Sequence, residues 1–466
     1  KKNEAHPGQG ELFNEADEVT EAVPAEEVEK ESISYTRNKP KRKPLPTDLP
    51  REVVIHDLSD EEKQCDCCGH ELHKMGEDKS EQLEFIPAQI KVIENVRYKY
   101  SCRHCERHSD KTSIKTAKLP KAPIPKSIAT PSLLSQIITN KFQYALPLYR
   151  QEQMFMQHGI ELSRKTMSEW MMKCAELFKP IVQRLHEELL KQSAIHADET
   201  TLNVVNEDKS TCYMWVYCSG ADSPQENSLD KNIVLYDYQR SRSGQCAKEY
   251  LDDFTGYLQV DGYAGYEQTG ATLVGCWAHA RRKFVEIQKA QKGKSGKANM
   301  AINLIQKLYG IEKSIKDKTP EERKSLRQEK AIPIINQYKT WLEQSILQVP
   351  PKTAMGKAIA YSLNQWDKLT QYLKDGALDI DNNFAERQIK PFVIGRKNWL
   401  FANTSRGAQS SAKLYSLIET AKVNGLIPFH YLMHCLAELP KEGSQDTHLL
   451  KDHLLNIHFW KYIVFI

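Results

Sequence analysis

Apolar and polar positions alternate with a period of two through the middle of the chain, in short runs rich in Val, Tyr and Thr that polar turns separate. This alternation is typical of β-strands with one buried face. Between and after these runs, apolar residues recur at helical spacing. The predicted elements are, in order, strands at 194–205, 211–220 and 232–239, a helix at 244–254, strands at 257–262 and 272–279, and a helix at 280–290.

The segment before this α/β region carries helical patterns. Residues 129–190 predict several helices, including a short helix, a turn at Gly159 and a second helix that begins near Ser163. This is the spacing of a helix-turn-helix, in which Arg164 and Lys165 would lead the second helix into a DNA groove. An ordinary helical hairpin packed on the neighbouring domain gives the same pattern, so both alternatives stay open.

The segment after the last predicted strand is also helical. Residues 291–376 are highly charged, and we predict that they form a helical insertion ahead of a later helix. Thr319 followed by Pro320 is typical of a helix start, and Gly376 is typical of a helix end. Residues 402–439 predict further helices.

Two Cys-x-x-Cys pairs in the first quarter of the chain predict a zinc site. Cys65 with Cys68 and Cys102 with Cys105 supply four thiolates, the tetrahedral ligand set of a structural Zn²⁺. Alternating residues at 86–102 predict a hairpin that brings the second pair to the first. Reduced, buried cysteines are the alternative to metal binding. Competing ligands also lie close in the sequence, namely Cys67, His70 and His73.

Composition excludes a membrane protein and favours a soluble, globular one. The 466 residues carry a net charge of +4 with a mean hydropathy of −0.60, and no run approaches the roughly 20 apolar residues of a membrane span. The total hides a segregation of charge, because 4–31 is acidic and 37–43 is basic. We expect 1–50 to be mostly disordered, its basic part being either a solvated linker or a DNA contact. The 11 cysteines without a secretory signal favour a reducing, cytoplasmic environment.

Three acidic residues are the candidates for catalysis. Asp198 and Asp261 lie in predicted strands, and Glu386 lies on a later predicted helix. Two carboxylates on strands and a third on a helix are a common way to hold a pair of divalent ions for phosphoryl transfer. Basic residues follow Glu386 and would contact phosphate, namely Arg387, Lys390, Arg396 and Lys397.

Each acid also has a purely structural interpretation. Asp198 could be a strand-edge residue, and Asp261 could be a turn residue. Asn383 and Glu386 have the spacing of a capping box, so Glu386 could serve only to cap its helix.

The motifs around these acids resemble those of one family, the insertion-sequence-66 type of bacterial DDE transposases. The joint order of the motifs is more specific than any one of them. The resemblance extends over roughly 40–439 and fails after Pro440. The motifs are HADET at 196–200, QVDGYAGY at 259–266, CWAHARRKF at 276–284 and DNNFAERQIKPFVIGRKNWLF at 381–401.

The resemblance implies a fold and a reaction. The fold is a ribonuclease-H-like core, whose strand order matches the predicted one and in which the first and fourth strands lie side by side. Asp198 and Asp261 would then meet. Mg²⁺ (or Mn²⁺) would be held by these two residues and Glu386, with Asp198 bridging two ions. Water would attack at the transposon end, and the exposed 3′-hydroxyl would then attack target DNA.

The resemblance also implies partners and a supporting element. Expected partners are terminal inverted repeats, target DNA, further copies of the chain and accessory proteins of the same element, in the bacterial nucleoid and without a membrane. Cys276 and His279 match a Cys-x-x-His element that several DDE transposase families carry after their second acid. We expect a supporting role for this pair, because two ligands cannot close a zinc site. A half-buried cysteine and a helix-start histidine are the alternative.

We therefore predict a DNA transposase. The alternatives are a non-catalytic, zinc-containing DNA-binding regulator and a ribonuclease-H-like nuclease. The predicted domains are a disordered arm (1–50), a zinc-binding module (51–108), a helical DNA-binding segment (109–190), a catalytic domain (191–400) with its insertion (291–376), a C-terminal helical segment (401–439) and a divergent tail (440–466).

Overall fold

The computed structural model describes residues 53, 90–101, 107, 114–220, 232–290 and 296–441. These residues fall into two compact units, which meet in the sequence between Leu119 and Pro120. The arm at 1–50, the four paired cysteines and the tail beyond 441 lie outside the described residues. The predictions made for them are therefore not tested by the structure.

The smaller unit contains one two-stranded ribbon among its described residues. In it, β1 (Lys99–Ser101) pairs antiparallel with β2 (Ile114–Thr116). The predicted hairpin within 86–102 is wrong for its described part, since 90–98 forms no strand and the partner of β1 follows Cys105 in the sequence. The alternating segment ends in one strand of the ribbon, β1, and the other strand, β2, follows the second cysteine pair in the sequence.

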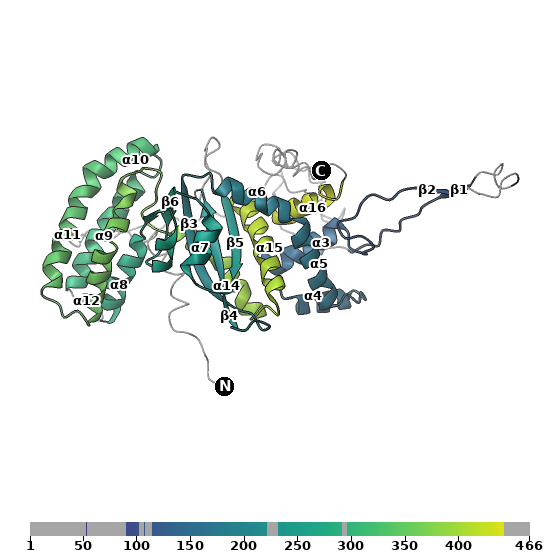
Figure 1. Ribbon diagram of the computed structural model, residues 1–466, viewed down its shortest axis with the longest axis horizontal. Helices are drawn as coiled ribbons and strands as arrows, with labels where there is room; N and C mark the ends of the chain where they lie inside the picture. Colours follow the sequence, from purple (N-terminus) through teal and green to yellow (C-terminus); the bar gives the residue numbers. More distant parts are fainter. Residues whose placement is uncertain are drawn as a thin grey trace, which may run out of the picture. The chain divides into compact units, whose positions relative to one another are not determined.

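A five-stranded mixed sheet forms the centre of the larger unit (Figure 1). β3 (Ala194–Asn203) pairs antiparallel with β4 (Thr211–Ser219), which pairs antiparallel with β5 (Ile233–Gln239). On its other side β3 pairs parallel with β6 (Tyr257–Gln259), and β6 pairs parallel with β7 (Thr272–Val274). The spatial order is β5-β4-β3-β6-β7. The first and fourth strands are therefore neighbours, as the sequence predicted.

The two last strands are shorter than predicted. β6 ends before Asp261, because the Asp261 carboxylate accepts a hydrogen bond from the backbone N–H of Tyr263 (2.8 Å) and forms a turn. β7 ends before Cys276, and α8 (Trp277–Ala290) begins where the prediction continued the strand. Asp261 and Cys276 thus lie in loops at the ends of two parallel strands.

Helix α14 (Asn383–Trp399) covers the face of the sheet that carries His196. The His196 ring meets the Phe384 ring edge-on, with centroids 5.5 Å apart. Because side chains alternate between faces along a strand, Asp198 shares this face with His196 and also points toward α14. The first turn of α14 therefore lies over the first candidate acid.

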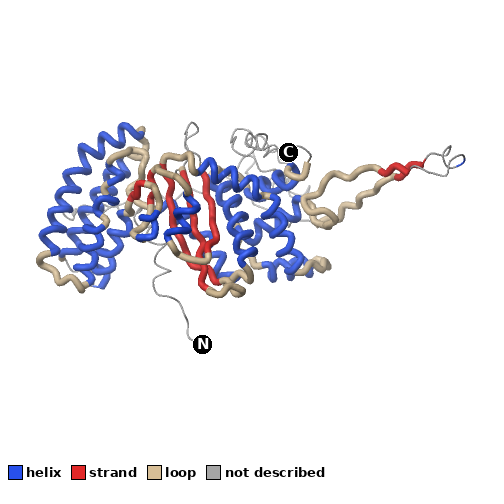
Figure 2. The backbone as a smooth tube through the Cα atoms, in the orientation of Figure 1, coloured by secondary structure: helices blue, strands red, loops and turns tan. Residues whose placement is uncertain are grey.

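The opposite face is covered by α7 (Gly244–Leu251), whose Tyr250 stacks on Tyr217 of β4 at 4.3 Å. Figure 2 shows the sheet between helices on both sides. The sheet is thus a buried layer, with one face toward α14 and the other toward α7.

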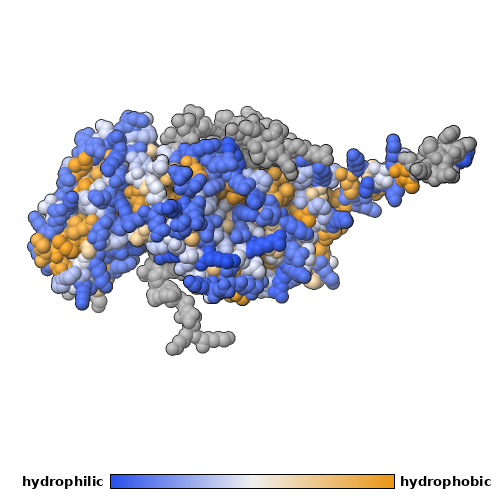
Figure 3. All heavy atoms as spheres, viewed as in Figure 1, coloured by the Kyte–Doolittle hydropathy of each residue, from blue (hydrophilic) through white to orange (hydrophobic). Residues whose placement is uncertain are grey.

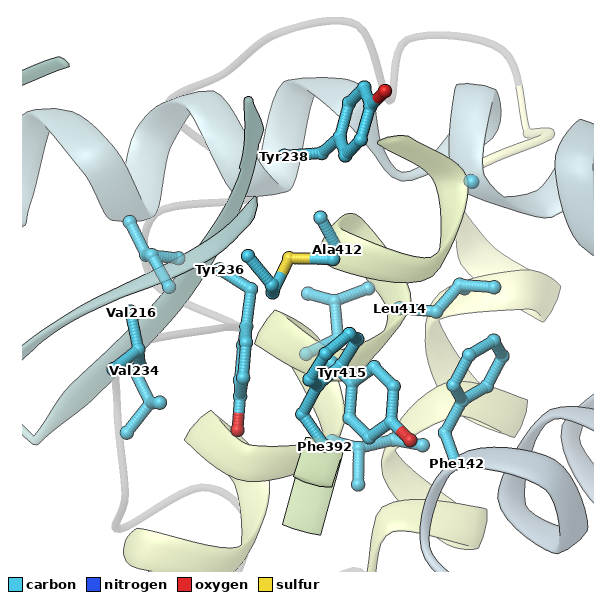
Figure 4. Close-up of a cluster of buried hydrophobic side chains, with 14 of the residues drawn as sticks. Phe142, Val216, Val234, Tyr236, Tyr238, Phe392, Ala412, Leu414 and Tyr415 are labelled. Atoms are coloured by element: carbon cyan, nitrogen blue, oxygen red, sulfur yellow. The ribbon is translucent and has the colours of Figure 1, made fainter. Parts of the chain in front are cut away.

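The free edge of β5 is covered by α15 (Ser405–Val423). The backbone N–H of Val234 donates to the Thr420 hydroxyl (3.0 Å), and that of Tyr236 donates to the Ser416 hydroxyl (2.8 Å). Tyr236 also packs beside Phe392 and Tyr415 in the buried cluster of Figure 4. Side-chain hydroxyls therefore satisfy an edge that would otherwise be open to pairing with another chain.

The helices that precede the sheet belong to the larger unit. They are α3 (Pro131–Phe142), α4 (Leu148–Gln157), α5 (Arg164–Leu177) and α6 (Lys179–Leu189). α3 packs against α16 (Pro428–Glu438), and α5 packs against α15. The helices at the two ends of the larger unit thus form one layer beside the sheet.

The predicted insertion is helical and has a hydrophobic core of its own, to which α8 contributes. The prediction that Gly376 ends a helix is wrong, because the chain breaks into short turns after Asn364 and Gly376 lies in a turn. In the part of the chain described, no helix has the length and apolarity needed to cross a bilayer, and the visible face is largely hydrophilic (Figure 3).

The elements of the insertion are α9 (Lys297–Ser314), α10 (Pro320–Leu326), a π-helical turn (Arg327–Ala331), α11 (Ile332–Ile346), α12 (Ala354–Asn364), α13 (Trp366–Leu369) and a 3₁₀ turn (Gln371–Leu373).

Candidate active site

The register of the central strands aligns the first two acids. β3 and β6 pair with an offset of 63 positions, as in His196 opposite Gln259 (259 − 196 = 63). Asp198 and Asp261 are separated by the same offset (261 − 198 = 63). The parallel register therefore leads Asp261, two residues beyond the end of β6, toward Asp198 on the neighbouring strand, and the charge of Asp261 acts on Asp198.

The third acid, Glu386, also interacts electrostatically with Asp198. Burial raises the pKa of Asp198 well above its usual range, and the charges of Glu199, Asp261 and Glu386 raise it further. Burial likewise raises the pKa of Glu386 to about 7, against the opposing effect of the Arg282 guanidinium. Buried carboxylates that repel one another are typical of a site that holds cations.

The loop before α14 is fixed directly beside Asp198. The Asn382 amide donates to the carbonyl of Ala197 (2.8 Å), and the Asn382 backbone N–H donates to Cys276 Sγ (3.2 Å). Asn382 is the N-cap residue, and its side chain makes no capping hydrogen bond. The capping interpretation of Glu386 is therefore wrong. Glu386 lies in the first turn of α14, is 3% exposed, and has an Oε1 atom with no hydrogen-bond partner among the described residues.

His279 and Arg282 of α8 flank the Glu386 carboxylate. His279 Nδ1 lies 3.5 Å from Oε1, and Arg282 Nη2 lies 3.5 Å from Oε2. Arg282 Nη1 also lies 3.3 Å from His279 Nε2. A guanidinium only donates, so Nε2 accepts and the proton of the neutral ring is on Nδ1. Burial lowers the pKa of His279 to about 4, so the ring is neutral at pH 7.

Cys276 completes a compact group with these residues. One ligand atom each from Cys276, His279 and Glu386 lies within 4.8 Å of the others. The Cys276 sulfur already accepts the N–H of Asn382, and burial raises the pKa of the thiol well above its usual range. The hydrogen bond to Asn382 holds the loop before α14 in place. A metal-bound cysteine must be deprotonated, so the raised pKa of the Cys276 thiol argues against a thiolate ligand.

Asp379 and Asp381 lie just before α14 and are alternatives to Glu386 as the third acid, but each interacts with other residues. Asp381 Oδ2 accepts from the Tyr309 hydroxyl (2.8 Å), and Asp381 Oδ1 accepts from the backbone N–H of Asn383 (3.1 Å). Asp379 lies 3.6 Å from Arg323 and is about half exposed. Both carboxylates therefore stabilise the loop that precedes α14.

The insertion anchors this loop through one buried arginine. Arg327 is fully buried and makes two hydrogen bonds to the Glu312 carboxylate (2.9 and 2.7 Å). It also donates to the carbonyls of Tyr372 (2.8 Å), Asp375 (2.9 Å) and Leu378 (2.8 Å). The path of the chain into α14 thus depends on the insertion.

A fourth carboxylate and a cation were missed by the sequence analysis. Glu199 follows Asp198 and points to the opposite face, where it accepts from Arg242 (2.6 Å) and from the Tyr266 hydroxyl (2.6 Å). The Arg242 guanidinium lies 4.1 Å from the centre of the Tyr263 ring. Against the opposing effect of burial, the charge of Glu199 and, to a smaller extent, that of Asp261 raise the pKa of Arg242. Glu199 adjoins a predicted acid and could have been noticed, whereas no motif marks Arg242.

One of the predicted phosphate contacts reaches the strand of the first acid. Arg396 donates to the hydroxyls of Thr200 (3.3 Å) and Thr201 (3.0 Å). The other predicted contacts on α14 are half-buried or exposed, namely Arg387, Lys390 and Lys397. The structure thus brings Arg396 to β3, and contact of all four residues with phosphate stays a prediction.

The predicted helix-turn-helix has features of both of its interpretations. Gly159 has a positive φ of 71° in the turn, and the Ser163 hydroxyl caps α5 by accepting the N–H of Thr166 (3.2 Å). The buried face of α5 packs on α15, as a helical hairpin would. Arg164 and Lys165 are nevertheless exposed at the start of the helix.

Comparison with known families matches nearly the whole chain. Residues 126–410 match the family described as "Transposase IS66 family", and 62–106, which contain all four paired cysteines, match "zinc-finger binding domain of transposase IS66". Residues 416–450 match "IS66 C-terminal element", and 1–54 match "Transposase C of IS166 homeodomain". The expectation that the resemblance covers only 40–439 is therefore wrong at both ends.

Similar proteins occur in Sinorhizobium fredii. The uncharacterized protein y4jD is 34% identical over 408 residues, which cover 85% of this chain and 78% of that protein. The uncharacterized proteins y4hP and y4qI are each 32% identical, over 450 and 431 residues that cover 92% and 89% of this chain and 80% and 78% of the respective relative.

Proposed function

Because the chain belongs to the IS66 family of transposases, we propose that it cuts DNA at the ends of a mobile element and joins those ends to target DNA. The observation that supports this proposal is the effect of the Asp261 and Glu386 charges on the buried Asp198, together with the parallel register of β3 and β6. The strand order β5-β4-β3-β6-β7 supports a ribonuclease-H-like core, in which such acids occupy these positions.

The residues fit a divalent metal site. Carboxylate oxygens are the ligands that Mg²⁺ prefers, and the buried Glu386 Oε1 without a hydrogen-bond partner among the described residues suits a cation. A pair of Mg²⁺ (or Mn²⁺) ions, when bound, would activate the attacking hydroxyl and stabilise the leaving oxygen. Asp198 and Asp261 would hold the cations from the sheet, and Glu386 would hold them from α14.

Neighbouring side chains have supporting roles in this proposal. His279 and Arg282 orient the Glu386 carboxylate, and Cys276 fixes the loop before α14 through Asn382. Arg396 would contact the DNA phosphates beside β3. Glu199 has its charge balanced by Arg242 and Tyr266 on the opposite face, so it does not compete with the three acids for cations.

The partners follow from the family and from this chemistry. DNA is the substrate, both as the inverted repeats of the element and as the target. Assembly of several copies on DNA and accessory proteins of the same element belong to the proposal. A nuclease on the same core is the second candidate, and it is separated from a transposase by incubating the protein with Mg²⁺ and end DNA. A transposase yields joined products, and a nuclease yields only cleaved ones.

We expect about one Zn²⁺ per chain in freshly purified, reduced protein. Four thiolates, Cys65, Cys68, Cys102 and Cys105, form a closed tetrahedral set that suits a structural zinc, within a segment that matches a zinc-finger domain. Elemental analysis by mass spectrometry measures the zinc content. Zinc-free protein from a reducing preparation would contradict the prediction.

The matched variants for zinc are Cys102→Ser and Cys435→Ser. Cys102→Ser is expected to lose the metal, and Cys435, which is buried in α16, is not one of the proposed ligands. Retention of a full zinc equivalent by Cys102→Ser would assign the site to other ligands, such as Cys67, His70 or His73.

DNA binding is expected to weaken when Arg164 and Lys165 are both replaced by Ala. The two side chains are exposed at the start of α5, where each can neutralise a phosphate. Affinity for end DNA at 0.1 M salt should fall by about tenfold, and the salt dependence should become less steep. Fluorescence anisotropy across a salt series measures both quantities. An unchanged slope would leave this segment as a helical hairpin without a DNA contact.

A further inference from the structure

A groove of about 460 Å³ lies between α8 and α12, where the insertion packs on the helix that carries His279 and Arg282. Its floor is apolar, with Ile287 and Ala358. Neither catalysis by the acids nor the predicted DNA contacts use this groove.

Tyr361 connects the groove to the active site. It lies one helical turn after Lys357 on α12, and Lys283 Nζ lies 4.4 Å from the centre of its ring. A Cβ atom at Gly262 would come within 2.8 Å of the Tyr361 ring and hydroxyl. Gly262 directly follows Asp261, so the glycine lets the insertion contact the loop of the second acid.

Charge along the groove suits a nucleic-acid backbone. Arg282 lies beside Glu386, Lys283 is next to it in the chain, and Lys357 lines the groove farther along α12. Among the described residues that line the groove, Glu286 is the acidic one. A line of cations over an apolar floor can hold phosphates at the rim while sugars lie on the floor.

We propose that this groove receives the DNA strand as it continues from the scissile phosphate. Lys283 and Lys357 contact its phosphates, and Tyr361 is a positioning residue that holds Lys283 next to the loop of Asp261. The inference rests on the proposed function, because it places DNA at the three acids. It gives the helical insertion a direct part in binding the substrate.

The test is the double variant Lys283→Gln/Lys357→Gln, compared with Lys307→Gln/Lys324→Gln. The control removes two exposed lysines of the insertion that do not line the groove, so the change in net charge is the same. Anisotropy with end DNA is measured from 0.05 to 0.3 M salt. The groove variant should lose about two units of the logarithmic salt slope and bind about tenfold more weakly at 0.1 M, and the control should match the wild type.

Tyr361 is tested by conservative rescue. Tyr361→Phe keeps the ring beside Lys283 and should bind end DNA like the wild type, whereas Tyr361→Ala should bind as weakly as a Lys283→Gln variant. Thermal melting shows whether each variant is folded. Equal binding by folded Ala and Phe variants would overturn the positioning role.

The experiments give different results if the proposal for the groove is wrong and if the proposed function is wrong. A wild-type protein that neither binds nor cleaves end DNA overturns both. A wild-type protein that cleaves, together with a groove variant whose salt slope equals that of the control, overturns the groove alone. A benzophenone amino acid at position 357 should crosslink to the DNA strand. Crosslinking to a second copy of the chain would instead assign the groove to a protein interface.

Discussion

Glu386→Gln is expected to abolish both end cleavage and strand joining. The change removes the negative charge that the proposed metal site needs from α14 and keeps the size of the side chain. Folding should be unaffected, because Glu386 does not cap its helix and its carboxylate is repelled by Asp261. Product formation from labelled end DNA should fall below about 1% of the wild-type rate, since loss or misplacement of such a group by about 1 Å costs at least 100-fold.

The matched control for this variant is Asp381→Asn. Asp381 precedes α14 by two positions and accepts from Asn383 and Tyr309, and an amide oxygen preserves part of this role. The control should retain most of the activity, and both variants should bind end DNA like the wild type. If Glu386→Gln stays active while Asp381→Asn is inactive, the third ligand is Asp381 and the site must be redrawn around the loop.

Arg327→Met is expected to destabilise the protein strongly. The arginine is fully buried and donates to Glu312 and to three backbone carbonyls. Its loss leaves the largely buried Glu312 carboxylate with only the more distant Arg323 (3.6 Å) and removes a donor from each carbonyl. Removing one partner of a buried ion pair costs about 3–5 kcal/mol. For a unit of this size we expect the melting temperature to fall by roughly 10 °C.

Lys330→Met is the control for this prediction. Lys330 is an exposed cation in the same π-helical turn, and its loss should leave the melting temperature unchanged. Arg327→Lys keeps the charge but not the planar fork, so it should melt between the wild type and Arg327→Met. Calorimetry measures all three. A melting temperature of Arg327→Met within about 2 °C of wild type would show that the network contributes little.

The strand pattern, together with the fold that its order resembles, was sufficient to predict that the strands leading to the first two acids are neighbours. Period-two runs gave the number and order of strands, and that order predicted the adjacency of β3 and β6. The ends of the short parallel strands could not be predicted in the same way. A turn at Asp261 and the start of α8 depend on local hydrogen bonds, which a hydrophobic pattern does not encode.

Contacts between residues far apart in the sequence could not be predicted from it. Asn382 joins β3 to the loop before α14 across 185 positions, and Arg327 joins the insertion to that loop across 51. An isolated asparagine or arginine has no periodicity that reveals its partner. Asn383 and Glu386 show the opposite error, since a local spacing matched a capping box that the helix does not use.

We propose that Asp198, Asp261 and Glu386 together catalyse metal-dependent cutting and joining of DNA. The most direct measurement of this activity incubates the wild-type protein with Mg²⁺, duplex DNA carrying the ends of its element, and supercoiled target DNA. We expect cleaved ends with free 3′-hydroxyls and ends joined to the target, both abolished by EDTA. Cleavage without joined product would point to a nuclease, and products that persist in EDTA would contradict metal-dependent catalysis by these acids.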